Sequence, residues 1–276
     1  MNEIPLFFPC GSYRLFGVLH LPLGVPKKSG FILCHPFGEE KLWTQLVYVN
    51  FARELTHRGY PVFRFDYMGN GDSDGNFEDS SVETNLADIR CAREFFKEKA
   101  GPLRSVGLIG IRFGATLAAL VSEDEPEIDR LILWEPILDG SRYMQELLRI
   151  NLISQMAVYK EIRYNRGALV QTMKEGQTAN SDGYEIALSM YEQVVSINLL
   201  EGPKRRSQAK CLIVQIAPKQ KEFRTDFSLL CSLYQDGHVL MSSEEPFWKE
   251  IRAFYSRAQR LYQDTLNWLE QYENEL

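Results

Sequence analysis

Short apolar runs alternate with amphipathic stretches along the first half of the chain. The apolar runs fall at residues 31–35, 60–67, 105–110 and 131–138. The stretches with helical spacing between them fall at residues 42–58, 81–99 and 115–123. Continuous apolar runs of this length are typical of strands buried on both faces, and strands that alternate with helices pair in parallel through crossovers. The pattern therefore predicts an α/β protein with a mostly parallel sheet between layers of helices.

The pattern changes at the two ends and in the middle of the chain. Residues 5–22 alternate and turn at Gly11-Ser12, which predicts an N-terminal β-hairpin. Residues 137–200 show helical spacing only, and strand-like runs return at KCLIVQIA and HVLMSS before a last helix from about 248 to 273.

This change of rhythm predicts one sheet domain with an insertion. We expect residues 1–136 and 206–276 to form the core, and residues 137–205 to form a helical lid between its sixth and seventh strands. The insertion lacks linkers of its own, so we interpret it as part of the same domain.

The net charge, apolar runs and cysteines of the chain indicate which binding partners and which cellular compartment to expect. A net charge of −6 argues against a nucleic-acid surface or an anionic membrane surface. No apolar run approaches the ~18 residues of a membrane span, and the N-terminus lacks the features of a signal peptide. The five cysteines are odd in number and scattered, and Cys34 and Cys211 lie in strand-like runs where buried free thiols are expected. We therefore predict a reduced, cytoplasmic protein without a membrane span.

The segment GIRFG, residues 110–114, follows an apolar strand and precedes a helix of small residues. It has the frame of a nucleophile elbow, G-x-S-x-G, with Arg112 in place of the serine. Such a turn holds the side chain of residue 112 at the carboxyl edge of the sheet. Arginine cannot act as the nucleophile there, because its guanidinium stays protonated and has no lone pair to donate.

Four features in this order resemble the α/β-hydrolase superfamily. They are the His35-Pro36-Phe37-Gly38 loop after the third strand, the segment DYMGNGDSDG, the GIRFGA turn, and the helical lid. The resemblance implies an α/β-hydrolase fold, with a mostly parallel eight-stranded sheet flanked by helices and a helical lid insertion. More narrowly, GIRFGA, LILWEPILDGSRYMQELLR and EEPFW resemble the hydrolase-like proteins associated with the exosortase A system, one group of which has arginine at the elbow.

Compared with this superfamily, the other two members of a Ser-His-Asp triad are also missing. The stretch Pro218–Lys221 stands where the acid is expected, and Glu245–Trp248 stands where the base is expected. His238 follows a glycine, as the base often does, but it precedes its strand instead of following it. We therefore assign no catalytic residue, and keep Arg112, His35, Glu135 and His238 as candidates.

A buried guanidinium requires a partner, because an unpaired buried charge is very costly. Glu135 ends the sixth strand, and Glu39 and Glu40 follow the third, so each is a candidate ion-pair partner of Arg112. One interpretation is that the ion pair of Arg112 and its carboxylate only fills the position of the hydrolase active site. The other is that Arg112 and the helix N-terminus bind a carboxylate or phosphate. The residues expected to line a ligand site are Arg112, His35, Phe37, Gly38, Phe113 and Glu135.

Three functions remain open from the sequence. The first is a non-catalytic or divergent member that binds a small anionic or acyl ligand, or a protein partner. The second is an active esterase- or thioesterase-like hydrolase that uses an unorthodox site around His35. The third is an assembly scaffold. No cofactor is expected, because the glycine spacing fits no dinucleotide fingerprint, and no His/Cys cluster has metal-ligand spacing.

Overall fold

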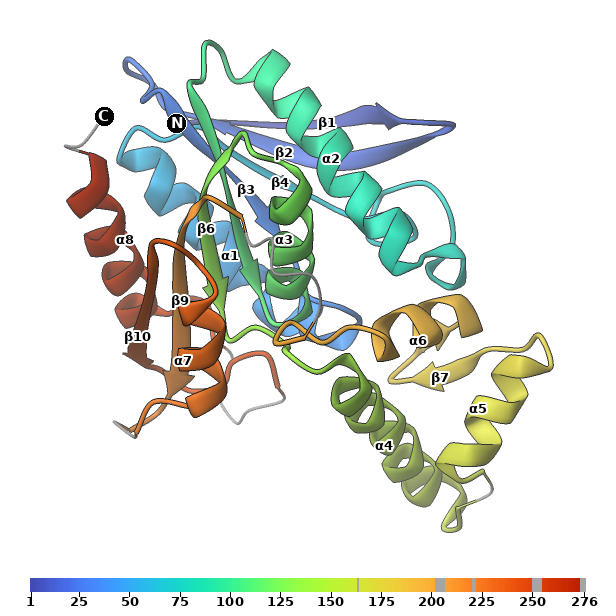
Figure 1. Ribbon diagram of the computed structural model, residues 1–276. Coiled ribbons are helices and arrows are strands. Elements are labelled where there is room, and N and C mark those ends of the chain that lie inside the picture. The colour runs from blue at the N-terminus through green and yellow to red at the C-terminus, as the bar shows by residue number, and fades with distance from the viewer. Residues whose placement is uncertain (163, 202–206, 220–221, 250–254, 274–276) are drawn as a thin grey trace.

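The computed structural model describes residues 1–276 apart from 163, 202–206, 220–221, 250–254 and 274–276. An eight-stranded sheet forms its centre, with strand order β1-β2-β4-β3-β5-β6-β9-β10 (Figure 1). The first three strands in this order pair antiparallel, and all later pairs are parallel. The strands are β1 (Asn2–Cys10), β2 (Tyr13–Leu21), β3 (Ser29–Cys34), β4 (Val62–Phe65), β5 (Ser105–Ile111), β6 (Ile128–Trp134), β9 (Lys210–Ala217) and β10 (Gly237–Ser243). The predicted mostly parallel eight-stranded sheet is confirmed.

Helices cover both faces of the sheet, as the doubly apolar strands require. On one face α1 (Glu39–His57) and α8 (Gln259–Glu273) pack over side chains such as Ile109 and Ile111. On the other face lie α2 (Val82–Lys99), α3 (Phe113–Asp124) and α7 (Thr225–Ser232) (Figure 1). A short 3₁₀ turn, η1 (Phe77–Asp79), precedes α2.

The segment between β6 and β9 leaves the sheet at its carboxyl edge and extends away from it (Figure 1). We call this segment the insertion. It contains α4 (Gly140–Tyr159), α5 (Arg166–Lys174), β7 (Ala179–Ser181), β8 (Tyr184–Ile186) and α6 (Leu188–Val195). The prediction of helices alone was wrong here, because β7 and β8 form an antiparallel hairpin. The hairpin turns at Asp182-Gly183, both with positive φ, and its strands are too short to show a period.

Two further expectations need correction. The last described helix begins at Gln259 instead of near residue 248. Residues 246–249 form a tight turn, in which the Lys249 N–H donates to the Pro246 carbonyl, and residues 250–254 of the predicted helix lie outside the described residues. Cys10 and Cys91 form a disulfide, with 5.6 Å between their Cα atoms, although we expected a reduced protein. No sequence pattern predicts this pairing, because α2 brings Cys91 to the end of β1 across 81 residues. Cys34 and Cys211 are buried and are not disulfide-bonded, as predicted.

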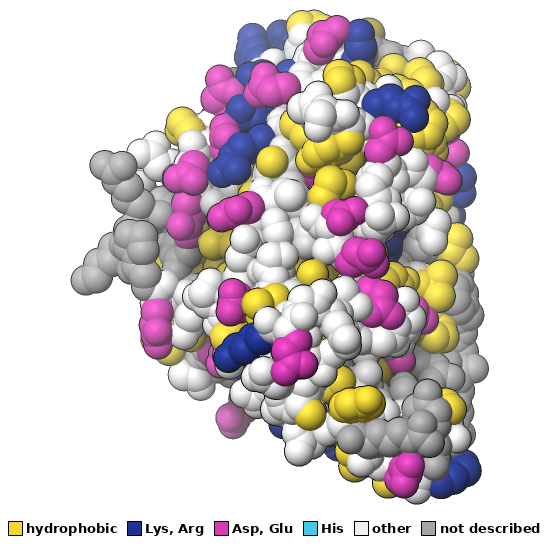
Figure 2. Space-filling model, turned by 90° about the vertical axis from the view of Figure 1, so that its right-hand side faces the viewer, with side chains coloured by type: hydrophobic (Ala, Val, Ile, Leu, Met, Phe, Trp, Pro, Cys, Tyr) yellow, Lys and Arg dark blue, Asp and Glu magenta, His cyan; other side chains and the backbone are white. Residues whose placement is uncertain are grey.

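The surface does not concentrate positive charge on the face that carries α2 and the insertion. Acidic and basic side chains are interspersed there, and hydrophobic side chains form several separate groups between them (Figure 2). Among the described helices, none is both long and apolar enough to cross a membrane.

Candidate functional site

The turn between β5 and α3 brings the Arg112 backbone into a conformation that a non-glycine residue rarely adopts, with φ 53° and ψ −124°. Two glycines make the turn sterically feasible. A Cβ on Gly110 would lie 2.4 Å from the Ala115 Cα, and a Cβ on Gly114 would lie 2.2 Å from the Cys34 carbonyl oxygen. The glycine frame that the sequence showed is therefore a steric requirement of this strand–turn–helix.

Arg112 points into the protein and is only 9% exposed. Its Nε donates a hydrogen bond to Glu40 Oε1 at 3.0 Å, and the Tyr143 hydroxyl donates to Glu40 Oε2 at 3.1 Å. Within the part of the chain that the structure describes, Nη1 and Nη2 of Arg112 have no hydrogen-bond partner. One edge of the guanidinium is thus held in place, and the other edge is free to bind.

Aromatic rings surround the guanidinium. Its central carbon lies 5.1 Å from the ring centre of Trp248 and 5.8 Å from that of Tyr143, both within cation–π range. Trp248 comes from the loop after β10, the position where a hydrolase would supply its base. Its Nε1 is buried, and no hydrogen-bond partner for it exists among the described residues.

Burial and charge act in opposite directions at this ion pair. Burial raises the pKa of Glu40 above its ordinary value, and the Arg112 charge and the hydrogen bonds from Arg112 and Tyr143 reduce this increase without cancelling it. For Arg112, burial lowers the pKa, but the charge and hydrogen bond of Glu40, with the charges of Tyr143 and Glu135, together raise it by more, so the guanidinium stays charged. The site therefore has a fixed cation beside a carboxyl that accepts a proton more readily than usual.

A cavity of about 860 Å³ lies above this ion pair, between the sheet edge and the insertion. This volume falls within the range of small-molecule sites, roughly 300–1,000 Å³. The core contributes the loop and first turn of α1 together with Arg112, Trp248 and Lys249, and the insertion contributes one side of α4 and the β7–β8 hairpin. The main apolar and aromatic lining residues are Phe37, Trp43, Tyr143, Leu147, Ile150, Ile153, Tyr184 and Trp248.

Two helices begin at the floor of this cavity. α1 starts after Gly38, which has φ 56°, and α3 starts after Arg112. Neither start has a side-chain cap, so their first backbone N–H groups and the positive ends of both helix dipoles remain available. Gly38 and Arg112 both line the cavity, so the floor combines three features that favour negative charge.

Glu135, the second candidate partner of Arg112, pairs elsewhere. It ends β6 with φ 45°, accepts from the Ile216 N–H at 2.8 Å and binds Arg224 Nη1 at 2.9 Å. Burial raises the pKa of Glu135, and these contacts and the nearby Arg112 oppose the increase. Glu39, the third candidate, lies beside the Tyr184 hydroxyl and Asp182 of the insertion, and burial raises its pKa. Of the three carboxylates, Glu40 is the one that pairs with Arg112.

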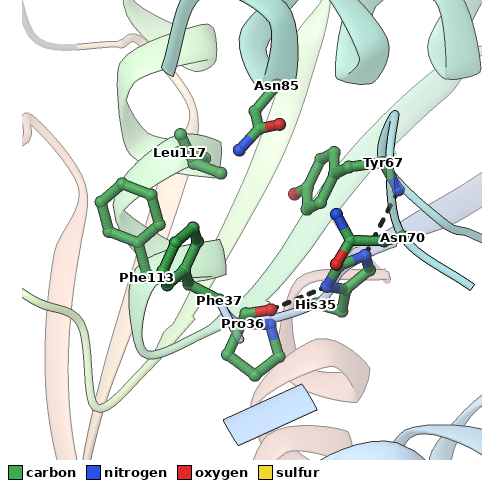
Figure 3. A pocket seen from close by; sticks show the side chains of 8 residues that line it. All are labelled: His35, Pro36, Phe37, Tyr67, Asn70, Asn85, Phe113 and Leu117. Carbon is green, nitrogen blue, oxygen red and sulfur yellow. Dashed lines mark hydrogen bonds between the residues drawn. The ribbon is translucent and has the colours of Figure 1, made fainter. Parts of the chain in front are cut away.

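His35 lies in a separate corner with no free nitrogen (Figure 3). Nε2 accepts from the Tyr67 backbone N–H at 3.3 Å, so Nδ1 carries the proton and donates to the Pro36 carbonyl at 2.7 Å. Burial, with the charge of Lys41, lowers the pKa of His35 to about 3, so the ring is neutral at ordinary pH. The adjoining void of about 10 Å³ has room for roughly one water molecule. His35 thus holds its loop and does not face the large cavity.

The remaining predicted residues divide between the two cavities. Phe37 lines both, Gly38 lines the large one, and Phe113 lines the small one while stacking on Tyr143 at 5.6 Å. His238 begins β10, so it lies at the amino edge of the parallel sheet, opposite Arg112. Of the stretch where an acid was expected, Gln220 and Lys221 lie outside the described residues.

Sequence reasoning left Tyr143, Trp43, Trp248 and Arg224 out of the predicted ligand site. Tyr143 and Trp43 sit on helices where an aromatic residue normally signals packing, so nothing distinguished them. Arg224 precedes α7 in a polar loop, and its pairing with Glu135 joins segments 89 residues apart. Within the described residues, no three His, Cys, Asp or Glu side chains are arranged to hold a metal ion.

The sheet order and the strand–turn–helix at Arg112 define an α/β-hydrolase fold. A family model described as serine aminopeptidase, S33, matches residues 26–190, more than half of the chain, so the chain belongs to that family.

Curated relatives match only part of this chain. A protein of Mycoplasma genitalium with the provisional name esterase/lipase 2 is 31% identical over 115 residues, which is 40% of this chain and 39% of the relative. An uncharacterized protein of Rickettsia prowazekii is 28% identical over 102 residues, 37% of this chain and 42% of the relative. The chain thus spans about two fifths of the length of these relatives.

Solved structures match nearly the whole chain. Est1E from Butyrivibrio proteoclasticus, solved with ferulic acid, has a TM-score of 0.66 at 15% identity and covers 96% of this chain and 98% of its own. An esterase of Pyrococcus furiosus has a TM-score of 0.63 at 12% identity, and the match covers 99% of this chain and 91% of the esterase chain. At these identities the likeness shows the fold, and the predicted α/β-hydrolase fold is confirmed.

Proposed function

We propose that this protein is an α/β-hydrolase-like member of its family that lacks serine-hydrolase chemistry and binds a small anionic or acyl ligand beneath the insertion, which acts as a lid. The observation that carries the proposal is Arg112. It occupies the strained turn of the elbow, is nine-tenths buried, and presents unpaired N–H groups to a cavity of about 860 Å³. If Arg112 only filled the former active site, we would expect all its N–H groups to be hydrogen-bonded and little space to remain beside it.

The surroundings of Arg112 support binding over catalysis. The loop after β10 brings Trp248 to the guanidinium in place of a histidine, and His238 stands at the opposite sheet edge. A hydrolase built on His35 receives no support, because both ring nitrogens are already hydrogen-bonded and the ring faces another cavity. A scaffold with a collapsed pocket is disfavoured by the cavity volume.

Two narrower proposals accompany this one. The resemblance to proteins associated with the exosortase A system predicts that exopolysaccharide and protein-sorting genes lie beside this gene in an assembled genome. The cytoplasmic location also stays a prediction, and the Cys10–Cys91 disulfide is the observation that argues against it, because structural disulfides are rare in a reducing compartment.

Turnover of p-nitrophenyl acetate and butyrate tests the main proposal. We expect wild type, Arg112→Ser and Arg112→Ala all to match the background without enzyme, because a serine at position 112 would have no base. Wild-type turnover that Arg112→Ala abolishes would instead show a hydrolase in which Arg112 binds the substrate or stabilises an oxyanion.

A further inference from the structure

The free edge of Arg112 limits the head group that the cavity can take. Glu40 fixes the guanidinium plane through Nε, and the two terminal nitrogens remain as a planar pair of donors. A carboxylate matches such a pair with two parallel hydrogen bonds, which is stronger and more specific than a single contact. The uncapped starts of α1 and α3 add positive potential at the same place.

The charges that line the cavity favour a single negative charge on the ligand. Glu40 already neutralises Arg112 at the floor. The other lining charges comprise three acids and two bases, namely Glu39, Glu146, Asp182, Arg149 and Lys249. A dianionic phosphate would therefore meet an acidic surplus, whereas a monoanion requires only the free edge of Arg112.

One face of α4 provides a path for an apolar chain. Tyr143, Leu147, Ile150 and Ile153 follow each other at helical spacing, and all line the cavity. Tyr143 is buried beside Glu40, whereas Ile153 is 58% exposed, so the path runs from the floor to the solvent. Ten residues of helix span about 15 Å at 1.5 Å per residue. Trp43 of α1 lines the same cavity.

From these observations we propose that the cavity binds a monocarboxylate with an extended aliphatic chain, its carboxylate on the free edge of Arg112 and its chain along α4. This inference rests on the binding function proposed above and specifies its ligand class. Arg112 and the two helix starts bind the carboxylate, and the apolar face of α4 that ends at Ile153 contacts the aliphatic chain of the ligand.

Glu40 couples such binding to protons. The groups that face its carboxyl are Arg112, Tyr143 and Lys249, and burial has already raised its pKa. A bound anion on Arg112 would raise the pKa of Glu40 further, so binding takes up protons and affinity increases as the pH falls. An alkyl sulfonate remains an anion as the pH falls, so any pH dependence of its affinity comes from the protein. The Glu40→Gln variant should lose that pH dependence.

The decisive experiment is a calorimetric titration of the whole protein with straight-chain carboxylates of increasing length, below their micellar range. Alkyl phosphates and alcohols of equal chain length serve as head-group controls. We expect up to about fourfold tighter binding per CH₂ until the chain passes Ile153, and at least tenfold weaker binding of the alcohol and of the phosphate at pH 8.

The outcomes separate the two proposals. If no amphiphile of any head group binds, the proposed binding function fails. If the phosphate or the alcohol binds as tightly as the carboxylate, the carboxylate inference is overturned and the binding function stands. Affinity that does not depend on chain length would overturn the path along α4.

Variants test the same two contacts. Arg112→Lys keeps the charge but loses the paired donors, so at least a tenfold loss of carboxylate affinity is expected. The control is Arg142→Gln, which changes an exposed arginine of α4 that does not line the cavity and should leave the affinity unchanged.

Ile153→Asp should weaken the binding of long-chain carboxylates and leave that of short-chain ones unchanged. Val158→Asp, at another exposed position on α4, is its control. Because Ile153 is exposed, that variant should fold even if Arg112→Lys does not. Equal affinity of Ile153→Asp and Val158→Asp for long chains would contradict the proposal.

Discussion

Two polar corners lie at the carboxyl edge of the sheet, one after β3 and one after β5, and they use their polar groups differently. In the His35 corner both ring nitrogens are hydrogen-bonded, and the adjoining void has room for about one water molecule. In the Arg112 corner half of the guanidinium is satisfied, and the remaining half faces a large cavity. Both residues are buried, so burial alone does not distinguish a structural polar group from a binding group. The two kinds of group differ in whether hydrogen-bonding atoms remain unpaired beside a cavity.

The largest effect on stability should come from breaking the ion pair of the Arg112 corner. Arg112→Met leaves Glu40 buried without its cation, which should lower the free energy of unfolding by about 3–5 kcal/mol at pH 8. The loss should shrink as the pH falls, because Glu40 can then accept a proton. Urea unfolding at several pH values measures this change.

A double variant provides the control for that prediction. Arg112→Met with Glu40→Gln removes the stranded charge, so it should regain most of the lost stability while still failing to bind the ligand. If the double variant were as unstable as the single one, the loss would have to come from packing and not from charge.

The Cys10–Cys91 disulfide should have the second largest effect. Reduction, or Cys91→Ser, frees a loop of about 80 residues in the unfolded chain and should cost about 2–4 kcal/mol. Ligand affinity should stay within twofold of wild type, because the disulfide joins β1 to α2, away from the Arg112 cavity. Chemical unfolding with and without reductant measures the first quantity, and titration of the reduced protein measures the second.

His35→Ala sharpens the comparison directly. It leaves the Tyr67 N–H and the Pro36 carbonyl without their partner, which should cost about 1–3 kcal/mol of unfolding free energy. Affinity for the ligand should not change by more than about twofold. A tenfold loss of affinity in a folded His35→Ala protein would mean that the two corners work as one site.

The last prediction concerns acid, whose effect on stability grows with the interval over which the pH falls. Burial lowers the pKa of His35 to about 3 and that of His20 to about 4, below the ordinary value near 6.5. Both stabilising contributions are complete above pH 6.5 and are lost as the pH falls toward 3–4, because the unfolded chain then binds more protons. Each histidine should contribute up to about 1.4 kcal/mol per pH unit in this window. The difference in unfolding free energy between wild type and His20→Gln from pH 7 to 4 isolates one of them.

The sheet could be predicted from the sequence because its strands are continuous apolar runs, and because the crossovers leave little choice of topology. The tight turn at Arg112 was predictable from its two glycines. Gly114 is required by the Cys34 carbonyl oxygen, 80 residues earlier in the chain, whereas Gly110 is required by Ala115, five residues later. Local constraints of this kind are visible in the spacing of residues.

The site itself was only partly predictable. The sequence predicted a carboxylate partner for Arg112, but the choice of Glu40 over Glu135 depends on Arg224, which pairs with Glu135 from another strand connection. Tyr143 and Trp248 reach the guanidinium from segments that follow Arg112 by 31 and 136 residues. These choices depend on long-range packing that no local pattern records.

The insertion between β6 and β9 has a consequence for the history of the family. β6 and β9 pair directly, so the intervening segment forms a closed excursion from the sheet. The entropy of closing such a loop grows only slowly with its length, by about 0.6 kcal/mol for each doubling. Lengthening, shortening or replacing this segment therefore changes the cavity wall at little cost to the sheet, and ligand preference can diverge among relatives whose cores remain the same.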